Sequence, residues 1–258
     1  MMGMDRSALE IVIDLEARKL ARATVVRVAT AAALVLVMAT TAGGYTAAMH
    51  AGDTDLGRKA ASMVTSPGWD GYTALGATSV SVTMLLAVGV VMSWSTGREF
   101  VDGTVVGLFA IPPPLGIIAA AKMAVVLTWA TILGAVEAGA LTTAGLLLGL
   151  GPKGAAGCYT ALMLVAALLS ASVLPVMWAA TRWRGYLAGI GLTLAILVVT
   201  NLAAGFGLGT YTPWSIPVAW TMTHDDVSTL LLVVPVMTAA IGAWVTLRSW
   251  DRLQLGTD

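Results

Sequence analysis

Charged residues are scarce in this chain. Only 11% of its 258 residues are Asp, Glu, Lys or Arg, whereas 58% are hydrophobic. A soluble domain of this length would carry roughly 25% charged residues. So little charge excludes a water-soluble fold and indicates that a lipid bilayer is the solvent. The formal net charge is zero, so the composition favours no nucleic-acid partner.

Cysteine and histidine are almost absent as well. The single Cys158 excludes an intrachain disulfide and is interpreted as a small buried apolar residue. His50 and His224 lack the closely spaced ligands of a zinc site, so no metal is predicted. The sequence contains no Gly-x-x-x-x-Gly-Lys-[Ser/Thr] phosphate loop and no Ser-His-Asp or Cys-His set. We therefore expect a chain that is not an enzyme, holds no cofactor and hydrolyses no ATP by itself.

Six long apolar runs take the place of the missing charge. Each is long enough to cross about 30 Å of hydrocarbon as a helix, and abundant Ala and Gly allow such helices to pack closely. The predicted fold class is therefore all-α, a polytopic membrane protein with six transmembrane helices. The third run is too long for one straight span, so its start is expected to lie in the interface or the helix to tilt. The predicted spans are Val28–Met49, Thr73–Ser95, Ile117–Leu148, Ala155–Ala180, Tyr186–Leu208 and Val227–Leu247.

Basic residues are divided unequally between the loops. With a cytoplasmic N-terminus, eleven Lys and Arg residues lie inside and three lie outside, and this bias predicts that both termini are cytoplasmic. The inner set is Arg6, Arg18, Lys19, Arg22, Arg27, Arg98, Lys122, Arg182, Arg184, Arg248 and Arg252, and the outer set is Arg58, Lys59 and Lys153. We divide the chain into an N-terminal segment, residues 1–27, and a membrane domain, residues 28–258.

The N-terminal segment has the pattern of an amphipathic helix from about Ser7 to Arg22. Ser7 and Glu10 have the spacing of a capping box, and Asp14 and Arg18 are placed to form an ion pair. Such a helix can lie along the inner leaflet with its basic residues near anionic headgroups. The alternative is a solvated leader helix without a partner.

The longest inner loop, Ser95–Lys122, concentrates charge and backbone-breaking residues. Gly97 and Gly103 bracket a segment that is predicted to form a helix of one or two turns, and three consecutive prolines precede the third span. The alternative is an ordinary polar loop. The charged residues of the bracketed segment are Arg98, Glu99 and Asp102.

The stretch GREFVDGTVVGLFAIPPPLGIIAAAK resembles the hallmark loop of type-2 ATP-binding-cassette (ABC-2) permeases, with its Gly-x-Glu-x-x-x-Gly-Thr, Pro and following basic residue. The leader LEARKLARATVVRVAT is similar to that family's Glu-x-x-Lys leader. Six spans with both termini inside agree with the family over the whole chain. One departure is the Leu115-Gly116 pair after the prolines, where the family often has a basic residue.

The resemblance implies the permease subunit of an exporter in the bacterial inner (plasma) membrane. Such permeases pair with a second permease copy or a paralogous permease, and each half docks on an ABC ATPase subunit, two copies in all, which binds ATP and Mg. The resemblance also implies a connecting helix that contains Glu16, Lys19 and Arg22. The implied cytoplasmic coupling helix contains Arg98, Glu99, Phe100, Asp102, Gly103 and Thr104, with Glu99 at a tip that is inserted into the ATPase.

Few polar residues are expected at membrane depth. Glu137 is interpreted either as a group that contacts substrate or a cation in the pathway or as an interhelical hydrogen-bond partner. Asn201 is interpreted mainly as an interhelical contact and secondarily as part of the pathway. In the resembling family, the place of Gly207–Asp226 holds short outer re-entrant helices, and Pro213 and Pro217 break this segment. The alternative is a flat interfacial loop.

Apolar cavity walls suggest an amphipathic or hydrophobic cargo, such as a drug, a peptide antibiotic or a lipid, so multidrug efflux is one expected role. Three other hypotheses stay open at this point: a secondary carrier driven by protons through Glu137, a membrane-embedded enzyme, and a membrane anchor that transports nothing. An ATPase in the neighbouring reading frame would favour the exporter.

Overall fold

The computed structural model describes residues 6–50, 52, 54–64, 66–222 and 227–254. These residues form helices and connecting turns, with no strand among them. Six helical segments of this described part are long and apolar enough to cross a membrane. They are Thr24–His50, Gly68–Val101, Leu115–Leu147, Ala155–Arg182, Tyr186–Gly205 and Thr229–Asp251. The all-α fold with six membrane helices is therefore confirmed, and the chain is a multi-pass membrane protein.

The individual elements follow the chain in a simple order. Span one consists of α2, the π-helical segment η1 and α3, and span four consists of α8 and α9. The bounds are α1 Arg6–Arg22, α2 Thr24–Met38, η1 Ala39–Gly43, α3 Gly44–His50, α4 Asp55–Met63, α5 Gly68–Val101, α6 Val105–Leu108, α7 Leu115–Leu147, α8 Ala155–Ser172, α9 Pro175–Arg182, α10 Tyr186–Gly205, α11 Ile216–Met222, η2 Thr229–Leu232 and α12 Val233–Asp251.

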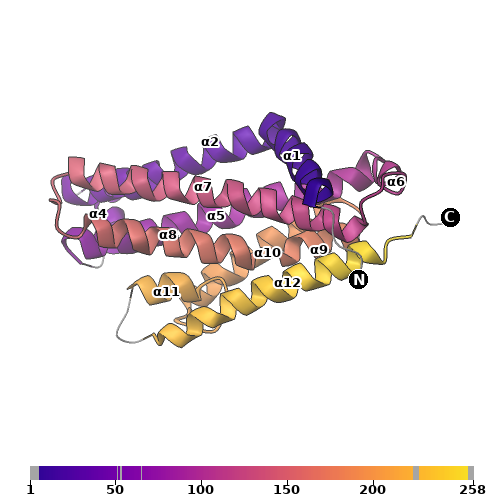
Figure 1. Ribbon diagram of the computed structural model, residues 1–258. Helices are drawn as coiled ribbons and strands as arrows, with labels where there is room; N and C mark the ends of the chain where they lie inside the picture. Colours follow the sequence, from indigo (N-terminus) through magenta and orange to yellow (C-terminus); the bar gives the residue numbers. More distant parts are fainter. Residues whose placement is uncertain (1–5, 51, 53, 65, 223–226, 255–258) are drawn as a thin grey trace.

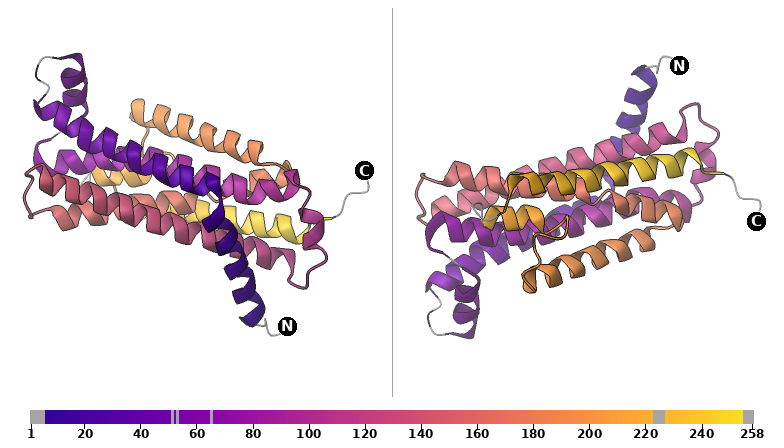
Figure 2. Two further views of the ribbon diagram at one scale, coloured as in Figure 1. Left: turned by 90° about the horizontal axis from the view of Figure 1, so that it is seen from above. Right: turned by 90° about the horizontal axis from the view of Figure 1, so that it is seen from below.

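The spans form an elongated bundle around α5 (Figures 1 and 2). In the most apolar stretch of α5, 78% of the residues are buried inside the protein. The buried share of the corresponding stretch is 22% in span one and 22% in the last span. Many outward-facing residues of the peripheral helices are large and apolar, among them Val35, Leu194 and Ile241, as lipid contact requires. The helix α1, the end of α12 and α6 lie at one end, which we call the basic end, and α4 lies at the opposite end (Figure 1).

The helix α1 is a separate element. The helical backbone is interrupted at Ala23, which has extended backbone angles. On the N-terminal side of this interruption, α1 crosses α7 at a steep angle to α2 (Figure 2, left). Val12 and Leu20 are buried on its inner face, while Arg18 and Asp14 form an exposed ion pair of 2.8 Å. The predicted amphipathic helix and its ion pair are therefore confirmed. The side chain of Ser7, on which the predicted capping box depends, lies outside the described residues.

Two spans depart from a straight α-helix. In span one, five residues from Ala39 to Gly43 are π-helical, and Thr41 of this segment is buried. Span four breaks after Ser172 because Pro175 starts a new helix and cannot continue the previous one. The third span, in contrast, is a single helix of 33 residues, and its start at Leu115 directly follows the three prolines.

The predicted re-entrant segment contains the short helix α11. Before it, the indole Nε1 of Trp214 donates a hydrogen bond of 3.1 Å to the carbonyl of Ser172, which lies within the fourth span. The helix itself packs against α5 and α8. The chain therefore returns from the end of α10 to the depth of the spans, where protein covers its backbone. Residues 223–226, the end of the predicted segment, lie outside the described residues.

Candidate functional site

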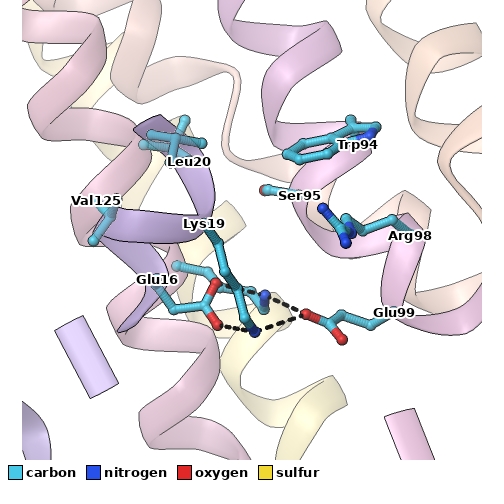
Figure 3. A pocket seen from close by; sticks show the side chains of 10 residues that line it. Glu16, Lys19, Leu20, Trp94, Ser95, Arg98, Glu99 and Val125 are labelled. Carbon is cyan, nitrogen blue, oxygen red and sulfur yellow. Dashed lines mark hydrogen bonds and ion pairs between the residues drawn. The ribbon is translucent and has the colours of Figure 1, made fainter. Parts of the chain in front are cut away.

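Four charged side chains meet at the basic end, where α1 crosses the spans (Figure 3). Lys122 of α7 is central: its Nζ donates to Glu16 Oε2 at 2.7 Å and to Glu99 Oε1 at 2.8 Å. Lys19 Nζ lies 2.8 Å from Glu16 Oε1 and 3.5 Å from Glu99 Oε1. We call these four residues the charge cluster. It joins three elements, α1, α5 and α7, that are far apart in the sequence.

The charge cluster is buried and electrically balanced. The side chain of Lys122 is 2% exposed, and those of Glu99 and Glu16 are 6% and 8% exposed. Two carboxylates and two ammonium groups compensate one another, which is the condition for keeping charges away from water. Thr104 adds a hydrogen bond of 2.6 Å to Glu99 Oε2, so both carboxylate oxygens of Glu99 are satisfied. The arrangement can transmit a displacement of one element to the other two.

Lys19 is the only member of the charge cluster that reaches the surface, with a side chain that is 37% exposed. Burial by itself lowers the pKa of Lys19. The hydrogen bond and charge of Glu16, together with the charge of Glu99, outweigh this, and the pKa is raised above its usual value of 10.5. Lys19 therefore stays charged at neutral pH. Arg22, also predicted in the connecting helix, is exposed and contributes only its backbone carbonyl, which accepts from Arg27.

Packing holds the end of α5 on its other sides. Gly97 touches the start of α10: a Cβ added there would lie 2.2 Å from the backbone nitrogen of Tyr186. Phe100 packs edge-on against Trp250 at 6.2 Å, and Trp250 Nε1 donates to Thr181 Oγ1 at 2.9 Å. The end of α5 is thus fixed to α10 and α12 as well as to α1 and α7.

The structure corrects the placement of the predicted coupling helix. Arg98, Glu99 and Phe100 are not in a separate short helix, because α5 continues to Val101. Glu99 does not project from a tip either, since Lys122 draws it inward and only 4% of the residue is exposed. Gly97 does not turn the chain out of span two. It provides room for α10 instead.

The exposed tip lies a few residues further along. Gly103, with a φ of +68°, supplies the turn after α5, in a backbone region that favours glycine. The four-residue helix α6 follows and projects from the bundle (Figure 1). Its Val106 is 57% exposed and Phe109 just after it is 38% exposed. Of the predicted coupling residues, only Asp102, Gly103 and Thr104 belong to this exposed turn, and Arg98 lies half-exposed over the Trp94 ring.

The two predicted pathway residues have opposite surroundings. Glu137 is fully buried between α7 and α5, where Oε2 accepts a hydrogen bond of 3.4 Å from Thr83 and Oε1 has no partner among the described residues. Asn201 is exposed on α10, and its amide donates to Leu197 O of the same helix. The interhelical contact that we predicted for Asn201 is therefore not made within this chain. His50 contacts only its own helix, and His224 lies outside the described residues.

Sequence reasoning identified three members of the charge cluster and missed the fourth. Lys122 was interpreted only as a basic residue at the start of a span. The signal was present, because a lysine within an apolar run requires an acidic partner. Its two partners, Glu16 and Glu99, were themselves expected to face the ATPase.

A protein-family model described as "ABC-2 family transporter protein" matches residues 12–201. The match includes the whole charge cluster, the exposed turn with α6, and Glu137. No curated protein matches the chain significantly. Because the family model covers well over half of the 258 residues, and the six spans agree with it, the chain belongs to the ABC-2 family of transporter proteins.

Proposed function

We propose that this chain is the permease subunit of an ABC exporter that moves an amphipathic or hydrophobic substrate out of the cell. The energy comes from hydrolysis of ATP, which is bound together with Mg by two copies of a separate ABC ATPase, and a second permease copy or a paralogous permease completes the pathway. The observation that carries the proposal is the charge cluster. It connects α1 and the exposed turn before α6 to the end of α5 and the first part of α7, as transmission from an ATPase requires.

The ATPase docks on the exposed tip at the basic end rather than on Glu99. Val106 and Phe109 offer apolar surface there, and Asp102 lies half-exposed beside them in the chain. Exposed apolar groups rimmed by polar ones are typical of protein contacts. Motion of α6 would reach Glu99 through Thr104, and the charge cluster would pass it to α7 and α1.

This docking is tested by co-purification with the ATPase from the neighbouring reading frame. The Val106→Asp variant should lose the ATPase, since a charge is placed in an apolar contact. The matched control is Met63→Asp, because Met63 is similarly exposed, at 54%, in the short helix α4 at the opposite end. Equal ATPase recovery with both variants would contradict docking at α6. Transport that persists without any ATPase would favour a secondary carrier.

The basic end faces the cytoplasm in this proposal. Eleven of the described Lys and Arg residues belong to this end by their place in the chain, and Arg58, Lys59 and Lys153 to the opposite end. A cysteine replacing Asp102 should resist an impermeant thiol reagent added outside intact cells, whereas a cysteine replacing Lys153 should react. Labelling of the Asp102 position from outside would reverse the orientation.

A further inference from the structure

Span one and α5 enclose an apolar groove of about 370 Å³ between them, apart from the charge cluster. Its walls are small or branched side chains such as Val28, Ala33 and Leu36 on α2 and Ala87 and Val90 on α5. The volume lies in the range of roughly 300–1,000 Å³ that is typical of small-molecule sites. The wall is almost entirely apolar, so it suits hydrocarbon or aromatic rings.

One polar side chain interrupts this wall. Thr83 of α5 lines the groove, and its hydroxyl donates to Glu137 Oε2 at 3.4 Å. Glu137 itself is 0% exposed, and its other oxygen has no hydrogen-bond partner in the described part of the chain. No Lys, Arg or His of that part forms an ion pair with it. A carboxyl group at this depth therefore lacks the compensation that such a group requires.

Further hydroxyl groups lie on α5 and span one within about two turns of Thr83. Ser79, one turn from Thr83 on α5, accepts a hydrogen bond of 3.0 Å from the hydroxyl of Thr40 of span one. The adjacent Thr41 is buried in the π-helical segment with its hydroxyl unpartnered. Buried polar atoms without partners are rare and call for an explanation, of which ligand binding is one, and π-helical segments are frequent at functional sites.

We propose that the groove and Glu137 together form a binding site for a hydrophobic organic cation. The hydrocarbon part of the ligand occupies the groove between α2 and α5. Its positive charge lies at Thr83 and is compensated by Glu137 after a rotation of the Thr83 side chain. A bare divalent cation fits less well, because one carboxylate and hydroxyl groups are too few ligands for it, and the described residues contain no cluster of three acidic, His or Cys side chains. The inference rests on the proposed function only in taking this ligand as the transported substrate.

The site is tested with the full chain in lipid nanodiscs and a pair of probes that differ in charge but hardly in shape. Tetraphenylphosphonium is the cation, and tetraphenylborate is the anion. Wild-type protein should bind the cation saturably. Glu137→Gln should weaken this binding by about tenfold or more, as expected when a charge-assisted contact is lost. Any binding of the anion should be unchanged by the substitution.

Three further variants make the result specific. Ala87→Phe fills the groove and should abolish saturable binding of the cation. Thr83→Val keeps the shape of the side chain but removes the hydroxyl, so it should weaken cation binding severalfold. This variant still tests the site if Glu137→Gln folds poorly. Asp70→Asn removes an exposed carboxylate near the start of α5, the helix that also carries Thr83 and Ala87, and it should leave cation binding unchanged. Elution volume and thermal unfolding show which variants are folded.

Any of three results would overturn the site. The first is an absence of saturable cation binding to wild type. The second is equal cation affinity in wild type and Glu137→Gln, and the third is saturable cation binding that survives Ala87→Phe. Since no ATPase is present in this measurement, a chain that binds the cation but shows no ATP-driven transport would contradict only the proposed function.

Discussion

Glu99 and Glu137 are the same residue type, both are buried, and both lie on adjacent helices of one bundle, yet their surroundings differ. Glu99 is held by Lys122, Lys19 and Thr104. Glu137 has one long hydrogen bond from Thr83 and no charged partner among the described residues. A compensated carboxylate connects parts of the protein, whereas an uncompensated one is left available to a proton or a ligand. The difference in charge compensation distinguishes the proposed mechanical role of Glu99 from the proposed recognition role of Glu137, although both side chains are buried.

The largest effect is expected from Lys122→Met, which leaves two buried carboxylates with only the half-exposed Lys19. Breaking a buried ion pair costs about 3–5 kcal/mol, so the free energy of unfolding should fall by that amount. The measurement is denaturant-induced unfolding in micelles. Lys59→Met, which removes an exposed lysine at the opposite end, should stay within about 0.5 kcal/mol of wild type. Equal free energies of unfolding for the two variants would mean that the charge cluster does not stabilise the packing of α1, α5 and α7.

The direct comparison uses the same substitution at both acids. Glu99→Gln should lower the free energy of unfolding by about 1.5–3 kcal/mol, because charge-assisted hydrogen bonds to Lys122 and Thr104 are weakened. Glu137→Gln replaces a buried carboxyl group that has no charged partner among the described residues by a neutral amide of nearly the same shape, so it should change stability by less than about 1 kcal/mol in either direction. If the two glutamine variants were equally destabilised, Glu137 would have a structural partner and the contrast would be lost.

Two glycine substitutions test how the end of α5, which carries Glu99, is held in place. Gly97→Ala places a methyl group against the backbone of Tyr186, so the helices must separate, at a cost of about 1–3 kcal/mol. Gly107→Ala in α6 meets no atom within 4 Å and should be neutral or slightly stabilising. Thermal unfolding distinguishes the two. An unaffected Gly97→Ala variant would show that α10 does not fix the position of Glu99.

The smallest effect concerns the exposed member of the charge cluster. The pKa of Lys19 is raised above 10.5, so its stabilisation is fully present below pH 10.5 and is lost as the pH rises through the higher folded-state value. The stability difference between wild type and Lys19→Met should be constant from neutral pH to about pH 10 and should shrink above that. Because Lys19 is partly exposed, the difference should be below about 1 kcal/mol. A difference that vanished near pH 7 would contradict this assignment.

Much of the fold followed from the sequence because apolar length is a strong signal. The six spans were located to within a few residues at most ends, and the start of the third span followed from the three prolines. The break in span four was missed although Pro175 signalled it. The π-helical segment of span one was not predicted, because the two threonines and the glycine of Ala39–Gly43 are poor helix formers but do not specify a π-helix.

The site was harder to predict for a physical reason. The family-like motif identified Glu16, Lys19 and Glu99, but a motif does not say which way a side chain points. Only the three-dimensional crossing of α1 over α7 brings Lys122 to both acids. The same limit applied to Asn201, which was expected to contact another helix and instead lies on the outer face of α10.

The separation of Glu16 and Lys122 in the chain has a consequence for biogenesis. These partners are 106 residues apart, so α1 leaves the ribosome long before its buried partner is made. At about 5–20 residues per second, that interval is roughly 5–20 s. During this time Glu16 has only Lys19 of its own helix as a charged partner within the charge cluster, and the docking of α1 has to wait until Lys122 and the third span are made. A nascent chain that stalls between Glu99 and Lys122 would therefore hold both acids of the charge cluster with Lys19 as their single ammonium partner.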